Sequence, residues 1–382
     1  MKRMMLAAVL LFTGAAFSQA RDDAAERAAV ARFGADIAAA FNARDPRAMQ
    51  SLIDVRALGT RAAKFLALKS TEQADFVRGF ETNASSQLTG AFIRMLEASE
   101  GSAKFMRVTD TVPARALLRM DMGDNGFDYL EFVVDTHGKR PRTVDWFRLS
   151  SGELMSVTLG GIGQLYTTED PGLLGRLFGV DRVEHSTVKK LRQAGDFHRQ
   201  GKYAEVLAVL RELPEPVANS RIMLTSQATM AVLSKQEAEY ARILATLARK
   251  YSNEPSTAFM LIDHYFNEKD LPHMLESIDT VEKRVGMDGV TRLLRGSAYF
   301  VAEDFNQALK HIDEAIKLEP DRLAAFDSRA TTLVRLGRFD DAVAQFRGME
   351  QQFSLRFTRE NFGTAEFAKF TASRQFEAWL PQ

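Results

Sequence analysis

A 34-residue spacing of small and large apolar residues in the C-terminal half is the feature that most constrains the fold of this 382-residue chain. In the clearest copy, the recurring positions are Gly296, Tyr299, Ala308, Ile312, Ala315 and Pro320. Moving forward by 34 residues gives similar residue classes at Ala330, Leu333, Ala342, Phe346 and Met349, and moving back gives Ile262, Tyr265, Met274, Ile278 and Val281. A period of this length predicts pairs of helices that stack on one another.

Helix packing explains the residue types at these positions. We expect Gly296 and Ala308 where two helices cross, because small side chains let the backbones approach. Pro320 ends the second helix, since it has no N–H group and disfavours helix in the preceding residue. An earlier, weaker copy contains Ala204 and Pro216, which have the same separation as Ala308 and Pro320 but are shifted in register by two residues.

This region resembles the tetratricopeptide repeat (TPR) family, which has the same small residue, tyrosine, alanine pair and closing proline in each two-helix unit. The resemblance is close for the units at 289–322 and 323–356 and weaker for the units before them. It implies an all-α TPR-like solenoid over 185–356. In this family, protein or peptide partners usually lie in a groove lined by the first helix of each unit.

The resemblance places groove positions in the two clear units at Leu293, Ser297, Phe300, Asp327, Thr331 and Arg335. The family's clamp for a peptide terminus uses several Lys, Asn and Arg side chains at such places, and here only Arg335 is basic. The mixed to apolar lining therefore favours a segment of a partner protein, or a second copy of this chain, over a bare carboxylate. The alternative is that Phe300 and Val301 simply pack into the neighbouring unit.

A stacked array needs an element that covers its last apolar face. The segment 364–380 is predicted to be a helix with Thr364 as its N-cap. Its aromatic residues Phe367, Phe370 and Trp379 would face the last repeat, while Glu366, Lys369 and Arg374 would face water. We therefore expect 357–382 to cap the array.

The first twenty residues have the pattern of a secretory signal peptide. A basic start precedes an apolar stretch and small residues, with Ser18 and Ala20 at the −3 and −1 places of a cleavage site. This pattern predicts removal of residues 1–20 and a periplasmic or secreted protein without stable membrane insertion. The alternative is an uncleaved anchor, although the apolar stretch is short for a spanning helix of about 20 residues. The chain has no cysteine, which excludes disulfides and lipid attachment at an N-terminal Cys.

Residues 21–168 are expected to form an α+β domain. Apolar residues recur every four positions at Ala29, Phe33, Ile37 and Phe41, and Asp45 followed by Pro46 marks the start of another helix. Further helices are predicted at 72–83 and 86–98. Five segments with short connections then indicate an antiparallel meander, at 104–110, 114–122, 127–135, 143–150 and 154–159. The glycines in "GGIG" at 160–163 suggest a bulge or bend at the end of the sheet.

Helices followed by a curled antiparallel sheet resemble the nuclear-transport-factor-2-like (cystatin-like cone) superfamily, and "FNARDPRAMQSLID" and "TVDWFRLSSGELMS" are similar to its opening helices and late strands. The resemblance implies a pocket, with candidate polar groups at Asp121, Tyr129, His137 and Asp145. An Asp base beside a Tyr donor can abstract a proton next to a carbonyl, as in an isomerase. Alternatively, Asp121 and His137 have only the ordinary role of polar residues in turns. An unrelated α+β domain is the rival fold.

The two predicted regions are joined by a connector at 169–184. Lys and Arg together number 50, as do Asp and Glu, so the basic excess typical of a nucleic-acid-binding protein is missing. No motif indicates a cofactor, and the six histidines lack the spacing of a metal site. The sequence therefore predicts an exported protein that binds other proteins through its repeats. A small-ligand-binding or isomerase- or hydratase-type enzymatic role for the N-terminal domain is the alternative.

Overall fold

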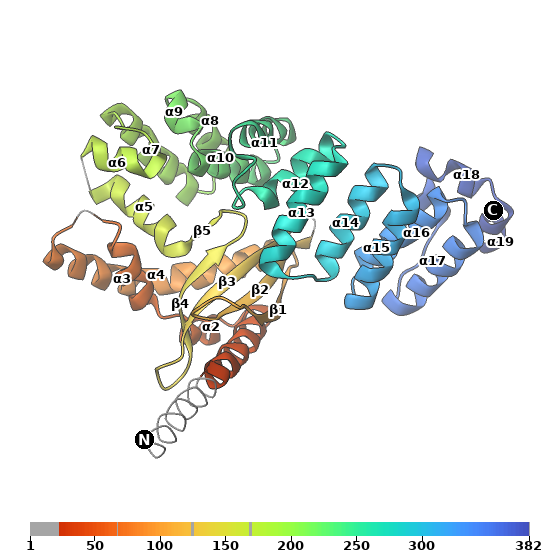
Figure 1. Cartoon of the computed structure of the whole chain (residues 1–382), viewed down its shortest axis with the longest axis horizontal. Helices are drawn as coiled ribbons and strands as arrows, with labels where there is room; N and C mark the ends of the chain where they lie inside the picture. Colours follow the sequence, from red (N-terminus) through yellow and green to blue (C-terminus); the bar gives the residue numbers. More distant parts are fainter. Residues whose placement is uncertain (1–22, 67, 124–125, 168–169, 382) are drawn as a thin grey trace, which may run out of the picture. The chain divides into compact units, whose positions relative to one another are not determined.

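The computed structural model describes residues 23–66, 68–123, 126–167 and 170–381 (Figure 1). The predicted signal peptide at 1–20 lies outside the described residues. The chain divides into two compact units, Met1–Thr246 and Leu247–Gln382. No helix in the described part of the chain is both long enough and apolar enough to cross a membrane.

The first unit contains the predicted antiparallel meander. Its strands are β1 (Ser102–Val108), β2 (Arg115–Asp121), β3 (Phe127–Asp135), β4 (Arg142–Arg148) and β5 (Glu153–Leu154), and they pair in chain order. Side chains alternate along β3, so Leu130, Phe132 and Val134 belong to the hydrophobic core and the residues between them point to the other face. This arrangement confirms the α+β class expected for the N-terminal region.

The face of the sheet that carries Leu130, Phe132 and Val134 is covered by helices. They are the helix at 23–42, α2 (Pro46–Leu52), α3 (Val55–Ala63) and α4 (Ser70–Ala98). The predicted start of α2 is confirmed, because the Asp45 side chain accepts hydrogen bonds from the backbone N–H groups of Arg47 and Ala48. Aromatic rings fill the space between these helices and the sheet: Phe41 lies 4.9 Å from Phe92, and Trp146 lies 5.7 Å from Phe92, between ring centroids.

The helix α4 is continuous, which corrects the two separate helices predicted at 72–83 and 86–98. The polar stretch between them does not interrupt it. Thr82 donates to the carbonyl of Arg78 and Asn83 to the carbonyl of Gly79, so both side chains bond to the preceding turn of the same helix. Ala84 is buried in the core and holds this middle section against its neighbours.

The prediction of a fifth long strand followed by a bend at the glycines was wrong. β5 has only two residues, and α5 (Met155–Thr167) begins directly after it. The buried Asp145 carboxylate accepts from the backbone N–H of Ser156 at 3.1 Å, which satisfies a donor in the first turn of the helix. Gly160 serves helix packing, because a Cβ there would lie 2.6 Å from the Phe65 Cβ and 3.0 Å from the Ala62 carbonyl oxygen.

The rest of the chain is helical. The predicted connector contains α6 (Pro171–Phe178). The first unit continues with α7 (His185–Arg199), α8 (Tyr203–Arg211), α9 (Glu215–Ala218) and α10 (Arg221–Leu233). The boundary between the two units falls within the next helix, α11 (Glu237–Tyr251). The second unit holds three helical hairpins: α12 (Ala258–Asn267) with α13 (Leu271–Val285), α14 (Gly289–Val301) with α15 (Phe305–Leu318), and α16 (Leu323–Arg335) with α17 (Phe339–Phe353).

The 34-residue period is confirmed by where the second helices of the hairpins begin. α8, α11, α13, α15 and α17 start at positions 203, 237, 271, 305 and 339, each 34 residues after the one before. The two-residue shift inferred for the first copy was wrong. Val206, 4% exposed, stands at the position of Ala308, whereas Ala204 is exposed. Matching by residue type selects Ala204, but the buried position is occupied by a larger apolar residue, Val206.

Close helix approach explains Gly296, as the sequence predicted. A Cβ at this position would lie 2.6 Å from Cγ1 of Ile312 and 3.2 Å from the carbonyl oxygen of Ala308, both on α15. Only a residue without a side chain lets α14 and α15 come this close. The helices cross at the positions that the repeat pattern marks as small.

The C-terminal segment is broken into short pieces, which corrects the single helix predicted at 364–380. They are η2 (Arg359–Phe362), η3 (Ala365–Phe367), α18 (Ala368–Thr371) and α19 (Arg374–Trp379). Thr364 precedes η3 without a capping side-chain bond, and Ser373 caps α19 by accepting from the backbone N–H of Phe376. The breaks let Phe362, Phe370 and Phe376 enter one aromatic core with Phe346 of α17, so the segment covers the last hairpin.

Candidate partner-binding groove

The predicted groove residues lie on the first helices of two successive hairpins. Leu293, Ser297 and Phe300 follow one face of α14, and Asp327, Thr331 and Arg335 follow one face of α16. Four of them are half-buried, while Asp327 and Arg335 are exposed. Side chains that are partly covered but still reachable are what a binding groove along these helices requires.

Arg335, the one basic residue of the predicted groove, is held by neighbouring groups. Its guanidinium carbon lies 4.5 Å from the ring centroid of Phe305 and 5.5 Å from that of Phe300, at cation–π distance. One of its terminal nitrogens lies 3.8 Å from a Glu303 carboxylate oxygen. Because these groups already surround its guanidinium, Arg335 is poorly suited to recognising a free carboxylate. The contact with Arg335 of α16 also means that Phe300 packs partly against the neighbouring hairpin.

The groove has an acidic end where the capping segment meets α16. Burial of the carboxyl group raises the pKa of Asp327, and the negative charge of Glu366 on η3 raises it further, although the residue as a whole keeps much of its surface exposed. The contribution of Glu366 means that two negative charges repel each other at this end of the groove. A positively charged group placed here would relieve that repulsion.

The four polar residues proposed for a pocket in the N-terminal domain are not brought together. Asp121 ends β2 and pairs with Arg119 at 3.2 Å, while His137 lies in the β3–β4 turn with its side chain 93% exposed and bonded to Asp135. Tyr129 is opposite Arg119 in the sheet register, whereas Asp145 is opposite Val133. Four residues along β3 separate these two places, which corresponds to roughly 13 Å of strand.

Asp145 has a structural role that accounts for its burial. It is fully buried, and its carboxylate accepts from the backbone N–H of Trp146 at 2.9 Å and from the N–H and Oγ–H of Ser156 at 3.1 Å and 2.6 Å. These bonds fasten α5 to β4. The Asp145 carboxylate, one of the candidate catalytic bases, therefore has its hydrogen bonds taken up by structural donors.

Sequence reasoning missed a partly buried ionic cluster between α13, α14 and α15. Both Arg292 and Arg295 lie 3.0 Å from a carboxylate oxygen of Glu282, and Arg295 also pairs with Asp279. On α15, Glu314 lies 3.2 Å from Nδ1 of His311 and 3.6 Å from Arg292. Burial lowers the pKa of His311, and the two arginines lower it further against the opposing charge of Glu314.

The 34-residue period offered a signal for part of this cluster. Arg295 recurs as Arg329, and Asp279 recurs as Asp313. In the structure, Arg329 Nε donates to Asp313 at 2.7 Å, so the same ion pair joins one hairpin to the next at two places. No group of three or more His, Asp or Glu side chains is placed to hold a metal ion anywhere in the described ranges.

No protein-family model matches the sequence, and no curated protein matches it significantly. Among solved structures, MamA from Desulfovibrio magneticus is similar at 15% identity over 45% of this chain and 97% of its own, with a TM-score of 0.37. A TPR protein of Thermus thermophilus, TTC0263, is similar at 18% identity over 44% of this chain and 91% of its own, with a TM-score of 0.29.

The TPR2AB domain of yeast Sti1, solved in a complex with pHSP90, is similar at 14% identity over 52% of this chain and 83% of its own, with a TM-score of 0.24. These likenesses are distant. The repeat architecture of this chain therefore rests on its own evenly spaced hairpins, in which the small residues lie at the helix crossings.

The structural role of Asp145 predicts a large loss of stability when its carboxylate is removed. Asp145→Ala should lower the free energy of unfolding of the first unit by about 3 kcal/mol or more, because buried N–H and O–H donors lose a charged acceptor. Ser156→Ala should cost about 1–2 kcal/mol. The chain has two tryptophans, so urea unfolding in a Trp379→Phe background reports on Trp146 alone.

The matched control is Asp110→Ala, since the Asp110 side chain is 86% exposed and pairs only at the surface. Its effect should stay within about 0.5 kcal/mol. An Asp145→Ala protein as stable as the unmodified chain would remove the structural role of Asp145.

Proposed function

We propose that the chain is a protein–protein interaction scaffold that binds a segment of a partner protein along α14 and α16. The observation that carries the proposal is the run of half-buried side chains on the first helices of two stacked hairpins. Stacked helical hairpins present such faces as extended surfaces, and this is how repeat proteins commonly bind.

The chemistry of the groove indicates the kind of partner segment. Leu293 and Phe300 supply apolar surface, while Asp327 and the nearby Glu366 supply negative charge at one end. Arg335 is engaged by two rings and by Glu303. A segment with apolar side chains followed by a Lys or Arg fits this lining better than a free carboxyl terminus.

Site-specific photo-cross-linking tests the location of the groove. A photoreactive amino acid at Ser297 or Thr331, in cells that produce the protein naturally, should give one discrete adduct. The same amino acid at Asn306, an exposed position on the second helix α15, should give none. Thr331→Lys should weaken capture several-fold by placing a positive charge beside Asp327, where the partner's Lys or Arg is expected.

The adduct mass also identifies the occupant. An adduct of two chain masses indicates that a second copy of this protein lies in the groove. An adduct that forms only from Asn306 would place the binding face on the second helices and contradict the proposal.

We also propose that the protein works outside the cytoplasm, on the basis of the signal-peptide pattern at 1–20. The mature protein should begin at Arg21. Ala20→Glu should leave the chain uncleaved, because the −1 place needs a small residue, whereas Gln19→Glu at the tolerant −2 place should be processed normally. Intact mass spectrometry of the protein from each strain measures this. A natural protein that retains Met4–Gln19 would contradict export by cleavage.

The N-terminal α+β region is proposed to act as a second recognition module. The order of helices followed by a meander supports its resemblance to the cone superfamily. Packed aromatic rings occupy the space between helices and sheet, so recognition through the outer surface is favoured over an internal ligand.

A further inference from the structure

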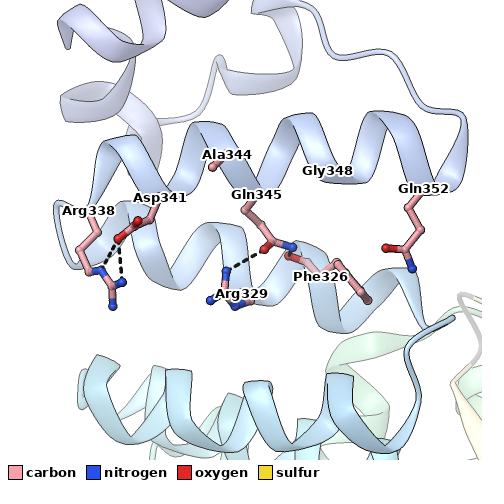
Figure 2. Close-up of a pocket in the computed structure, with 8 residues that line it drawn as sticks. All are labelled: Phe326, Arg329, Arg338, Asp341, Ala344, Gln345, Gly348 and Gln352. Carbon is pink, nitrogen blue, oxygen red and sulfur yellow. Dashed lines mark hydrogen bonds and ion pairs between the residues drawn. The ribbon is translucent and has the colours of Figure 1, made fainter.

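An open cavity lies at the last hairpin, and none of the residues that line it is a predicted groove residue. Its volume is about 260 Å³, and Phe326 and Arg329 of α16 and Gln345 and Gly348 of α17 are among its walls (Figure 2). Small-molecule sites are usually larger, at about 300–1,000 Å³. The size therefore suits a single side chain better than a whole metabolite.

The preceding hairpin shows how the same place can be filled. Moving back by 34 residues from Gln345 and Gly348 leads to His311 and Glu314 on α15. There the Glu314 carboxylate lies 3.2 Å from the ring of His311 and 3.6 Å from Arg292. In that hairpin the chain itself supplies a carboxylate to the position that corresponds to the cavity.

Gly348 opens the position in the last hairpin. A Cβ added there would meet no atom within 4 Å, so no close helix contact requires a glycine. Glycine inside a helix is destabilising relative to alanine, and α17 runs on both sides of it. The open space is thus kept without a packing reason, unlike the space at Gly296.

The hydrogen-bonding groups on the cavity wall favour a ligand that accepts. Arg329 donates through Nε to Asp313 and through Nη1 to Gln345, both at 2.7 Å, which leaves its Nη2 hydrogens for another acceptor. The Gln345 amide reaches the Phe326 carbonyl oxygen only at 3.5 Å, the long limit for a hydrogen bond. Arg338 neutralises the one carboxylate on the wall, Asp341, at 2.7 Å.

We propose that this cavity binds a carboxylate side chain, Glu or Asp, presented by a partner protein. The carboxylate lies at the position of Glu314 and accepts from Gln345, the counterpart of His311. The counterpart of Arg292 is Phe326, whose ring covers the methylene groups, so the cationic donor here is Arg329 instead. This site uses none of the groove residues, so it stands or falls separately from the groove.

Titration of the full chain with short capped peptides tests the proposal. Acetyl-Ala-Glu-Ala-amide should move the Nε–H resonance of Arg329 in a saturable way, at millimolar concentrations, with the resonance assigned from Arg329→Lys. Acetyl-Ala-Gln-Ala-amide, which lacks the carboxylate, should not move it. Succinate distinguishes the sources: a stronger response to succinate than to the Glu peptide would indicate a free small carboxylate and contradict the assignment to a side chain.

Two matched substitutions separate occupancy from folding. Gly348→Glu restores the residue of the preceding hairpin, so it should occupy the cavity and lower the affinity for the Glu peptide at least about tenfold. Gly348→Ala should raise the melting temperature through helix propensity while changing the affinity less than about twofold. Unshifted Arg329 resonances with every probe, or equal binding to the Gly348→Glu protein, would overturn the proposal.

Discussion

Each helical hairpin of the second unit has more apolar surface than its own two helices can bury, and the rest of this unit depends on stacking that surface against a neighbour. The stacking requires close approach, which is why Gly296 faces Ile312 and the carbonyl of Ala308 without a side chain between them. The last hairpin has no following hairpin to cover its apolar face. The aromatic core around Phe346, Phe362 and Phe370 covers that face.

Stacking by apolar contact does not by itself fix which turn of one helix meets which turn of the next. The repeated ion pairs Asp279–Arg295 and Asp313–Arg329 supply that information, because each joins the second helix of one hairpin to the first helix of the following one. Both pairs are partly covered by the stacked hairpins, and a slipped register would separate the two charges of each pair. We infer that these pairs align α14 with α16 and thereby set the spacing of the groove residues.

The repeated half of the fold was predictable because its signal is a spacing. The second helices begin at the predicted interval, and Gly296 lies at the predicted crossing. Residue identity is the weaker guide: alanine matching points to Ala204 as the counterpart of Ala308, whereas the buried counterpart is Val206. Burial is conserved along the array where side-chain size is not.

Outside the repeats, the wrong predictions of secondary structure fall where a side chain distant in the sequence determines the local structure. Asp145 accepts from Ser156 across eleven positions and turns a predicted strand into the start of α5, and Gly160 of α5 allows close contact with Phe65. Local sequence carries no record of either partner. The cavity at Gly348 was missed for a similar reason, since the meaning of this glycine emerges only when the preceding hairpin places Glu314 at the same position.

The central claim is that successive hairpins of the second unit are held in one register, and a charge-swap cycle on Asp313 and Arg329 tests it most directly. Unfolding in urea is followed by Trp379 fluorescence in a Trp146→Phe background. Asp313→Arg and Arg329→Asp should each destabilise the second unit, and the double swap should recover about 1 kcal/mol or more relative to the sum of the single effects. Strict additivity of the two substitutions would mean that the pair contributes nothing to holding the hairpins together, and it would contradict the account.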